Sequence, residues 1–360
     1  MENKIKCDFN VHLDGNVNFQ AVRHVLTLAE QNGVKAISLM EQNKLSLYSH
    51  GGVLHRLIKS GELEKFYTGK LISGCEITCV VNDTNPTKYA FNFNNHRIHL
   101  TLLNFDVERA ENIKWFDKKF RAKCFKKDVK LMIKLLKKNK LEYPSKNYFV
   151  FGTKDILYQV YDFVSANPQR KKAYDNFIGE FSTPTSFVKN VFENPHSKLF
   201  FKQSSVPYLS EVLSFARKVR GRLYISHPHN MNIKFNTVSY LDALINMDTE
   251  YGFPFDGIEV YNSLNSSIDT KVLNDYAITH NLEISGGTNY RYVRSPQNPE
   301  GKILFDDNGD RRYVVPIPGT MIKMKFETHN GDLLLDKKFV DRMYDIREYP
   351  RFEVGDGSQK

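Results

Sequence analysis

The stretch Asp8-Phe9-Asn10-Val11-His12-Leu13-Asp14-Gly15 decides the fold, because it ends a strand-like run in a series of polar side chains. Ile5–Val11 has the composition of a strand. A helical pattern follows at Phe19–Gln31, and a second strand-like run follows at Val34–Met40. A strand, a helix and a second strand in this order predict a parallel β-α-β unit.

The same rhythm continues along much of the chain. The other predicted strands are Lys70–Val81, Arg97–Leu103, Arg222–Ser226, Gly257–Tyr261 and Leu282–Gly286, and the other predicted helices are Gly52–Ser60, Tyr208–Arg220, Ser239–Asn246 and Asp269–Asn281. Strands that alternate with helices predict an α/β protein with a parallel sheet or barrel.

A helical segment interrupts this rhythm. Phe125, Val129, Met132 and Leu136 follow the i, i+4, i+7, i+11 spacing of an amphipathic helix, and further helical patterns follow. We therefore expect four parts. They are a first part of the barrel at 1–106, a basic helical insertion at 107–203, a second part of the barrel at 204–291, and a short α+β extension at 292–360 with a strand pair at Arg312–Ile317 and Met321–Thr328 and a helix at Lys337–Arg347.

The positive charge of the chain is concentrated in one segment. The net charge is +10, and Lys114–Lys140 alone contains twelve Lys or Arg and two Asp. A clustered basic face binds phosphates by displacing their counterions, which favours nucleic acid or a phosphorylated nucleotide as the partner. Lys126, Lys127, Lys130 and Lys134 are the expected contacts on the Lys118–Lys140 helix. A solvated lysine-rich helix without a ligand is the alternative.

Composition excludes several classes of protein. Hydrophobic residues make up 41% and charged residues 26% of the 360 residues, as in soluble proteins. No apolar run approaches the roughly 18 residues that span a bilayer, so we expect no membrane partner. The four cysteines include no CxxC pair, and the first residues include no signal-peptide core, so we expect a cytoplasmic protein.

Polar residues stand at the ends of the predicted strands, where the active sites of α/β barrels lie. After the opening stretch, the strand ends read Met40-Glu41-Gln42-Asn43, Gly74-Cys75-Glu76, His96-Arg97-Ile98-His99-Leu100, Ile225-Ser226-His227-Pro228, Gly257-Ile258-Glu259-Val260 and Gly286-Gly287-Thr288-Asn289-Tyr290-Arg291. Seven such endings in succession predict one shared site at the mouth of a barrel.

The order of these endings resembles the PHP (polymerase and histidinol phosphatase) superfamily. Members of that family open with Asp-x-His-x-His and continue with Thr-Asp-His, Gly-x-Glu, a His in Ile-His-Leu, His-Pro, Gly-Ile-Glu-Val and Gly-Gly-Ser-Asp-x-His. The resemblance covers about 5–291 and implies a distorted PHP-type (β/α)7 barrel. The helical insertion most resembles the branch that hydrolyses nucleoside 3′,5′-bisphosphates and short oligonucleotides from the 5′ end.

The resemblance also implies a set of metal ligands, since family members hold two or three divalent metals that activate water. The positions that match ligands are His12, Glu76, His99 and His227, with Asp14 as a further acid. Five positions depart from the family pattern, namely Asn10, Glu41, Gln42, Asn289 and Arg291. Glu259 matches an acid that supports the family's site, and a structural role is expected for it.

The departures weaken metal binding. Amides are poor ligands for Zn, Mn or Fe, and a guanidinium has no lone pair to donate. We therefore expect either no cofactor or a weakly bound divalent metal such as Zn, Mn or Fe. Arg291 is expected to reach into the site and to form a charge-assisted hydrogen bond with Glu76, with Asp14 or with a bound phosphate.

Three functional hypotheses remain open at this point. The preferred one is a catalytically weak or inactive binder of nucleic acid or a phosphorylated nucleotide. The second is an active metal-dependent phosphoesterase or nuclease with a reduced metal centre. The third is a structural subunit of a larger complex, in which the basic helix contacts protein.

Overall fold

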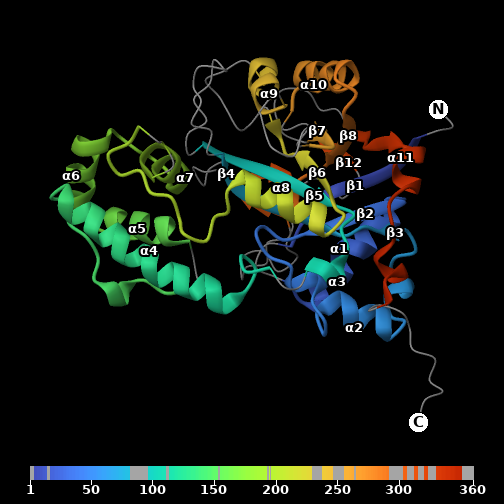
Figure 1. Ribbon diagram of the computed structural model, residues 1–360, viewed down its shortest axis with the longest axis horizontal. Helices are drawn as coiled ribbons and strands as arrows, with labels where there is room; N and C mark the ends of the chain where they lie inside the picture. The colour runs from blue at the N-terminus through green and yellow to red at the C-terminus, as the bar shows by residue number, and fades with distance from the viewer. Residues whose placement is uncertain are drawn as a thin grey trace, which may run out of the picture.

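Two five-stranded sheets form the centre of this mixed α/β structure, a computed structural model (Figure 1). It describes residues 4–13, 17–81, 96–110, 113–152, 155–192, 194, 196–228, 237–245, 255–262, 265–291, 303–305, 312–314, 320–322 and 330–350. Asp14 lies outside these residues, as does the side chain of Arg291. None of the described helices is long and apolar enough to cross a membrane.

The first sheet is built around the strand that carries the opening stretch. Its strands are β1 (Lys4–His12), β2 (Ala36–Met40), β3 (Lys70–Leu71), β9 (Tyr290–Arg291) and β14 (Leu334–Asp336). Strands β2 and β9 pair with β1 in parallel, whereas β14 pairs with it antiparallel. The last six residues of β1 are all buried, as is typical of a strand covered on both faces.

Helices α1 (Phe19–Gln31) and α2 (Val53–Lys59), with the short 3₁₀ helices Ser46–Tyr48 and Leu63–Lys65, link the strands of this sheet. The side chain of Asn18 accepts a hydrogen bond from the Ala21 backbone N–H and so caps α1. Val22, Val25 and Leu26 bury the apolar face of this helix in the main core.

The second sheet has the order β4-β5-β6-β7-β8. Its strands are β4 (Gly74–Val81), β5 (His96–Leu103), β6 (Arg222–Ile225), β7 (Gly257–Asn262) and β8 (Glu283–Gly287). Strand β5 runs antiparallel to both of its neighbours, β4 and β6, whereas β6, β7 and β8 run parallel to one another. Helix α8 (Leu209–Lys218) precedes β6, while α9 (Thr237–Ile245) and α10 (Ser267–Thr279) link the parallel strands.

The chain passes from one sheet to the other within the predicted strand Lys70–Val81, which is therefore two strands and not one. Ile72 still donates its backbone N–H to Ile37 of the first sheet, and Gly74 opens the second sheet. A Cβ at Gly74 would lie 1.9 Å from the Ser38 Oγ, so any other residue at this crossing would have to displace the Ser38 hydroxyl.

The two sheets contact each other at both ends. On one side Gln42, just after β2, forms a parallel bridge with Glu76 of β4. On the other side a Cβ at Gly287 would lie 2.1 Å from the Asn10 Cβ, so β8 approaches β1 closely. The buried Asp8 carboxylate accepts hydrogen bonds from the Thr288 backbone N–H (3.0 Å) and Oγ1 (2.6 Å), which fixes this second contact.

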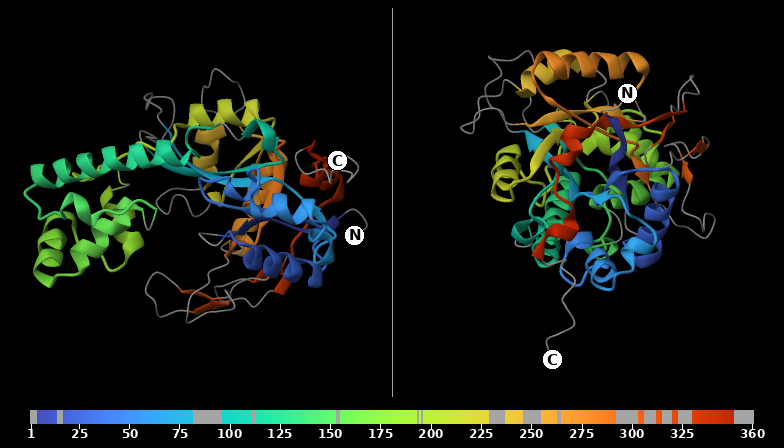
Figure 2. Two further views of the ribbon diagram at one scale, coloured as in Figure 1. Left: turned by 90° about the horizontal axis from the view of Figure 1, so that it is seen from below. Right: turned by 90° about the vertical axis from the view of Figure 1, so that its right-hand side faces the viewer.

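A helical lobe lies between β5 and β6 in the sequence and to one side of the sheets (Figures 1 and 2). The segment begins with α3 (Val107–Ala110), which lies with the sheets, and the lobe itself contains α4 (Lys118–Lys138), the 3₁₀ helix Lys146–Tyr148, α5 (Ile156–Ser165), α6 (Pro168–Ile178), α7 (Pro184–Phe187) and a π turn at Val188–Phe192. Residues from Val129 to Phe201 form a hydrophobic core separate from that of the sheets, whereas Val107, Ala110 and Trp115 belong to the main core.

Four of the described strands of the C-terminal part form two short pairs. Strand β11 (Arg312–Val314) pairs with β10 (Ile303–Phe305), and β12 (Thr320–Ile322) pairs with β13 (Asn330–Asp332). Most of the predicted pair Arg312–Ile317 and Met321–Thr328 lies outside the described residues, so that pairing stays a prediction.

The final helix is shorter than predicted, because α11 spans only Lys337–Asp341. After it, the Asp345 carboxylate accepts hydrogen bonds from the backbone N–H groups of Leu71 and Arg347, and it caps a 3₁₀ helix at Ile346–Glu348. These bonds fasten the end of the described chain to β3 of the first sheet.

Candidate metal centre

The carboxylate of Glu76 lies at the centre of the predicted site. Every residue of β4 is buried, and the Glu76 side chain is only 1% exposed. Because Thr78 pairs with His99 and Glu76 pairs with Thr101, Glu76 and His99 are diagonal neighbours on one face of the sheet. The His99 Nδ1 lies 3.2 Å from the Glu76 Oε1.

His227 reaches the same carboxylate from the next strand. The Ser226 backbone N–H donates to the His99 carbonyl (3.1 Å), which brings the residue after β6 beside β5. The His227 Nε2 then lies 3.8 Å from the Glu76 Oε2, and the His99 and His227 rings are 5.2 Å apart between centroids. The side chains of His99 and His227 are 32% and 14% exposed, so the cluster opens to solvent on their side.

The geometry of Glu76, His99 and His227 fits a divalent metal. One possible ligand atom from each residue lies within 4.8 Å of the other two. Ligand atoms on a metal with bonds of about 2.1 Å are about 3.0–3.4 Å apart, close to the distances from the carboxylate to the two imidazoles. The Glu76 Oε2 is buried and has no hydrogen-bond partner in the described part of the chain.

His12 lies deeper, against the same carboxylate. Its Nε2 is 3.5 Å from the Glu76 Oε2, and its side chain is fully buried. It is not one of the three residues whose ligand atoms all lie within 4.8 Å of one another. Burial by itself would raise the pKa of Glu76, yet the imidazoles of His12, His227 and His99 hold that pKa well below its ordinary value. Burial opposes the charged form of His227 as well, but Glu76 raises its pKa overall.

Asn10 does not contact Glu76. Its Nδ2 donates to the Glu259 Oε1 (2.9 Å), and the Glu259 Oε2 accepts the His227 backbone N–H (2.6 Å). Burial raises the pKa of Glu259. The register of β1 shifts between Asp8 and Val11, and that of β7 shifts between Glu259 and Tyr261, so a β-bulge lies on each side of the hydrogen bond between Asn10 and Glu259.

The two residues after β2 point in different directions. The Gln42 Nε2 donates to the Glu76 Oε1 (3.1 Å) and so belongs to the cluster. The buried Glu41 carboxylate instead accepts the Ser46 hydroxyl (2.6 Å) and the Leu47 backbone N–H (2.7 Å), which holds the following turn. The structure therefore places Gln42, but not the Glu41 side chain, at the predicted site.

The remaining predicted positions are only partly visible. Asn289 lies between β8 and β9 with a φ of 54°, and its buried Oδ1 has no hydrogen-bond partner in the described part of the chain. The backbone of Arg291 pairs with that of His12, which puts this position at the expected rim. Asp14 and the Arg291 side chain lie outside the described residues, so the expected contact between Arg291 and a carboxylate stays a prediction.

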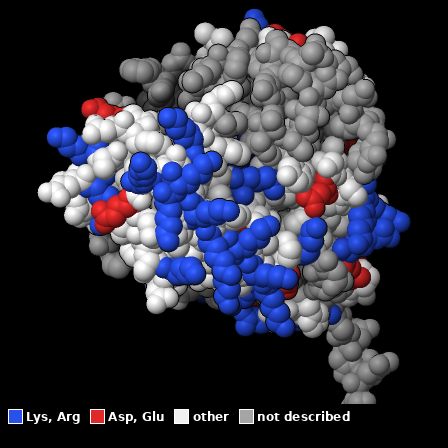
Figure 3. All heavy atoms as spheres, turned by 60° about the vertical axis from the view of Figure 1, so that its left-hand side comes forward, with Lys and Arg blue, Asp and Glu red and all other residues white. Residues whose placement is uncertain are grey.

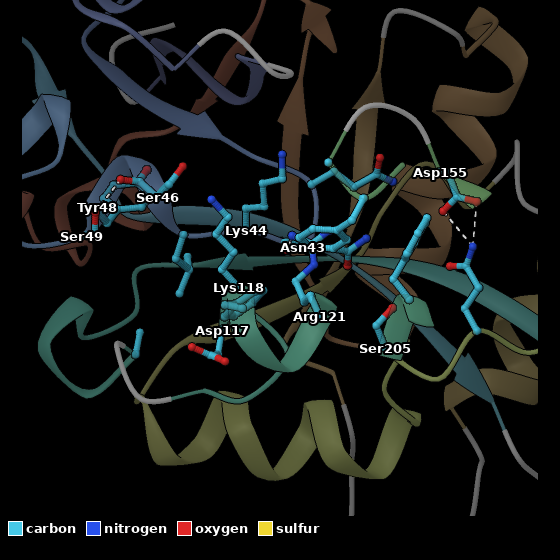
Figure 4. A pocket seen from close by; sticks show the side chains of 18 of the residues that line it. Asn43, Lys44, Ser46, Tyr48, Ser49, Asp117, Lys118, Arg121, Asp155 and Ser205 are labelled. Carbon is cyan, nitrogen blue, oxygen red and sulfur yellow. Dashed lines mark hydrogen bonds between the residues drawn. The ribbon is translucent and has the colours of Figure 1, made fainter. Parts of the chain in front are cut away.

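A pocket of about 780 Å³ adjoins the cluster, between the β2 end and α4. Gln42 lines the pocket and also contacts Glu76, so it belongs to both sites. Lys44, Lys118 and Arg121 contribute positive charge to its wall (Figure 4). The Arg121 Nη1 donates to the Asn43 carbonyl at 3.5 Å, which links α4 to the end of β2.

The acidic residues of this pocket are already engaged. Asp117 accepts the Phe120 backbone N–H as the cap of α4, and Asp128 accepts the Ser204 backbone N–H. Both carboxylate oxygens of Asp155 accept from the Gln203 amide, at 2.7 and 2.8 Å (Figure 4). These donors are neutral, so the three acids still balance the three cations of the lining in number. Among the described residues, Lys44, Lys118 and Arg121 form no ion pair with these acids and can therefore contact an anion.

Sequence reasoning missed this pocket, because its residues come from segments that no motif connects. The only signal was the local charge, which identified α4 but not the end that faces the site. Phe116, Phe125 and Phe151 complete the lining with aromatic surface. The predicted nucleic-acid contacts lie farther along α4, where Lys126, Lys127, Lys130 and Lys134 are all exposed.

Comparisons with known proteins give distant similarities. No family model matches the chain, and no curated protein matches it either. One similar solved structure is a protein described as a metal-dependent phosphoesterase from Bifidobacterium adolescentis, with a TM-score of 0.45 and 17% identity over 78% of this chain and 86% of that one. Another is an amidohydrolase from Chromobacterium violaceum with bound sulfate and no metal, with a TM-score of 0.43 and 14% identity over 78% and 87%.

Proposed function

We propose that the chain is a phosphoesterase with a reduced centre that holds one divalent metal, Zn, Mn or Fe. The observation that carries this proposal is the mutual approach of Glu76, His99 and His227, whose ligand atoms lie within 4.8 Å of one another. A carboxylate and imidazoles suit these metals. When bound, such a metal supplies Lewis-acid activation of a phosphate ester and of water.

Two amides limit the centre to one metal. Gln42 donates to Glu76, and Asn10 donates to Glu259, so each amide N–H takes a carboxylate oxygen that an additional metal would need. An imidazole at either position would instead offer a nitrogen lone pair. The amides thus compensate the buried carboxylates without a second ion, which supports a small centre over the two or three metals of the PHP pattern.

The substrate that we propose is a phosphorylated nucleotide. The adjoining pocket has the volume of a small-molecule site, about 300–1,000 Å³ in proteins generally. Lys44, Lys118 and Arg121 suit phosphate groups, and the rings of Phe116 and Phe125 suit a base. A phosphate held by these cations would stand next to Gln42 and therefore next to the Glu76 cluster.

We further propose that the two sheets act as one distorted PHP-type barrel, with this centre at its mouth. The bridge between Gln42 and Glu76 and the close approach of Gly287 to Asn10 support this arrangement, because they join the first and second sheets on both sides. The polar strand ends then face a common opening, as in other α/β barrels.

A metal-free binder of phosphorylated ligands is the second candidate. The hydrogen bond from Gln42 to the Glu76 Oε1 favours it, because this bond occupies one of the two carboxylate oxygens before any metal arrives. In that case the cations of the pocket, and not a metal, would hold the phosphate.

Metal content and hydrolysis separate the two candidates. We expect elemental analysis of protein purified without chelator to find about one metal per chain, and we expect slow release of phosphate from a nucleoside 3′,5′-bisphosphate. Glu76→Gln should abolish both, while Glu283→Gln, a carboxylate bound to Arg222 and Tyr224, should change neither. Bisphosphate binding without metal or turnover would support the second candidate, and the absence of metal, turnover and binding would overturn both.

A further inference from the structure

One face of α4 is an almost continuous row of cations. We define the lysine stripe as Lys119, Lys123, Lys126, Lys127, Lys130, Lys134, Lys137 and Lys138, all of which are exposed. Steps of three and four residues connect its members, so they follow the helix on one side. The 21 residues of α4 give the stripe a length of about 31 Å, and the basic patch is visible in Figure 3.

The two acids of this segment offset only a small part of the charge. Asp128 is buried on the opposite, apolar face beside Val129 and Met132, where its oxygens accept the Ser204 backbone N–H, although Lys127 interacts with it electrostatically. Asp117 caps the first turn through the Phe120 N–H. Eight lysines against these two acids leave the stripe strongly positive.

The fold holds the stripe in a fixed position. Near the start of α4, Trp115, Phe116 and Phe120 pack on the main core. Farther along, Val129 and Met132 are buried in the core of the helical lobe. A helix anchored in two cores loses little conformational entropy when its exposed face binds a ligand.

The stripe and the candidate site lie on different faces of α4. Lys118, Arg121, Phe125 and Asp128 line the pocket, and their spacing of three and four residues places them on the face of the helix opposite the stripe. A single nucleotide in the pocket would therefore leave the stripe uncovered.

Aromatic surface beside the stripe distinguishes between kinds of polyanion. The Lys137 Nζ lies 5.1 Å from the ring centroid of Tyr143, which is 37% exposed. Exposed rings next to cations stack on unpaired bases, which a duplex does not offer. A membrane surface fits less well, because Leu131 is the only large hydrophobic residue of α4 that is exposed.

We propose that the lysine stripe binds single-stranded nucleic acid. This function is separate from the phosphoesterase centre proposed above and stands on the stripe itself. The phosphates would contact the lysines, and the bases would turn toward Tyr143.

Salt-dependent binding tests the proposal. Fluorescence anisotropy would follow a labelled 12-nucleotide single strand and its duplex from low to high salt. A variant with Lys126, Lys127, Lys130 and Lys134 changed to Glu should reduce the slope of log affinity against log salt by about 3, because each lost single-strand phosphate contact contributes about 0.7. The control variant carries the same charge change outside α4, at the exposed residues Lys218, Lys271, Lys337 and Lys338, and should bind like the wild type.

The results of this binding experiment can be distinguished from those of the metal and hydrolysis measurements. Loss of strand binding in the stripe variant alone, with unchanged metal content and unchanged turnover of the bisphosphate, supports the proposal. Equal loss in the control variant, tighter binding of the duplex, or no binding by the wild type at low salt would overturn it. Lysine-dependent strand binding by a metal-free protein would leave the stripe standing and would remove the phosphoesterase proposal.

Discussion

The backbone of His227 has a φ of 29°, in a region that residues with a side chain rarely adopt. Such conformations cost on the order of 1–3 kcal/mol and persist where the surroundings enforce them. The Glu259 carboxylate supplies this constraint, because it accepts the His227 N–H at 2.6 Å while Asn10 holds its other oxygen. Glu259 therefore positions His227 through its backbone N–H.

Replacing Glu259 should weaken metal binding without removing any ligand. In Glu259→Ala the His227 N–H loses its acceptor, so we expect metal affinity to fall by about 10- to 100-fold, as for other residues that orient metal ligands. Glu259→Gln keeps an acceptor for His227 and should lie between the wild type and Glu259→Ala. Calorimetric titration of Zn²⁺ into metal-free protein measures the effect, and an unchanged affinity in Glu259→Ala would show that His227 needs no such support.

Much of the cluster could be predicted at the scale of single residues. His12, Glu76, His99 and His227 stand at strand ends whose order fixes where they meet, and the structure brings them together around Glu76. For two consecutive residues that follow a strand, such as Glu41 and Gln42, the sequence does not predict which side chain faces the site, because the conformation of the turn decides it. Glu41 was expected there, but it holds the turn at Ser46.

At the scale of the element, α4 combines a cationic face with a buried acid. Burial raises the pKa of Asp128, while Ser204 and Lys127 partly oppose this effect. The folded protein thus binds a proton at Asp128 more tightly than the unfolded chain does. Ionisation of Asp128 therefore lowers the free energy of unfolding progressively as pH rises from the ordinary Asp pKa to the raised pKa.

Two substitutions at Asp128 separate its charge from its hydrogen bond. Asp128→Ala leaves the Ser204 N–H without its acceptor and should lower the free energy of unfolding by about 1–3 kcal/mol. Asp128→Asn keeps an acceptor and does not titrate, so its stability relative to the wild type should be higher at pH 7 than near pH 4. Urea unfolding at both pH values measures this difference, and a relative stability that falls with increasing pH would contradict the assigned burial effect.

Elements with regular periodicity were predicted well, and those at junctions were not. The sequence pattern predicts α1 at its observed bounds, because its apolar face and its Asn18 cap are both local features. The division of Lys70–Val81 into β3 and β4 depends on the contact between Gly74 and Ser38, which joins distant parts of the chain. The two β-bulges beside Asn10 and Glu259 likewise depend on neighbouring strands and leave no local signal.

At the scale of the whole molecule, hydrophobic packing divides between the sheets and the helical lobe. Among the described residues, two buried clusters together form the core of the sheets, and a third forms the core of the lobe. Phe187 is fully buried in the core of the lobe, with its ring centroid 4.6 Å from that of Phe181, 5.3 Å from that of Phe192 and 5.6 Å from that of Tyr161. Phe9 of β1 belongs to the smaller cluster of the sheets, where its ring meets that of Phe339.

Two substitutions that each remove a buried ring should show whether the core of the lobe and the core of the sheets unfold independently. Phe187→Ala and Phe9→Ala each remove a buried ring, which costs about 3–5 kcal/mol of local or global stability. In Phe187→Ala we expect hydrogen exchange to accelerate in α5, α6 and α7 while β4 and β5 stay protected, since local unfolding follows cooperative units. Metal affinity should then be unchanged, because Glu76, His99 and His227 all belong to the sheets.

In Phe9→Ala we expect faster exchange in β1 and weaker metal binding. Equal acceleration in β4 and α5 in both variants, measured by mass spectrometry, would show that the two cores unfold as a single unit.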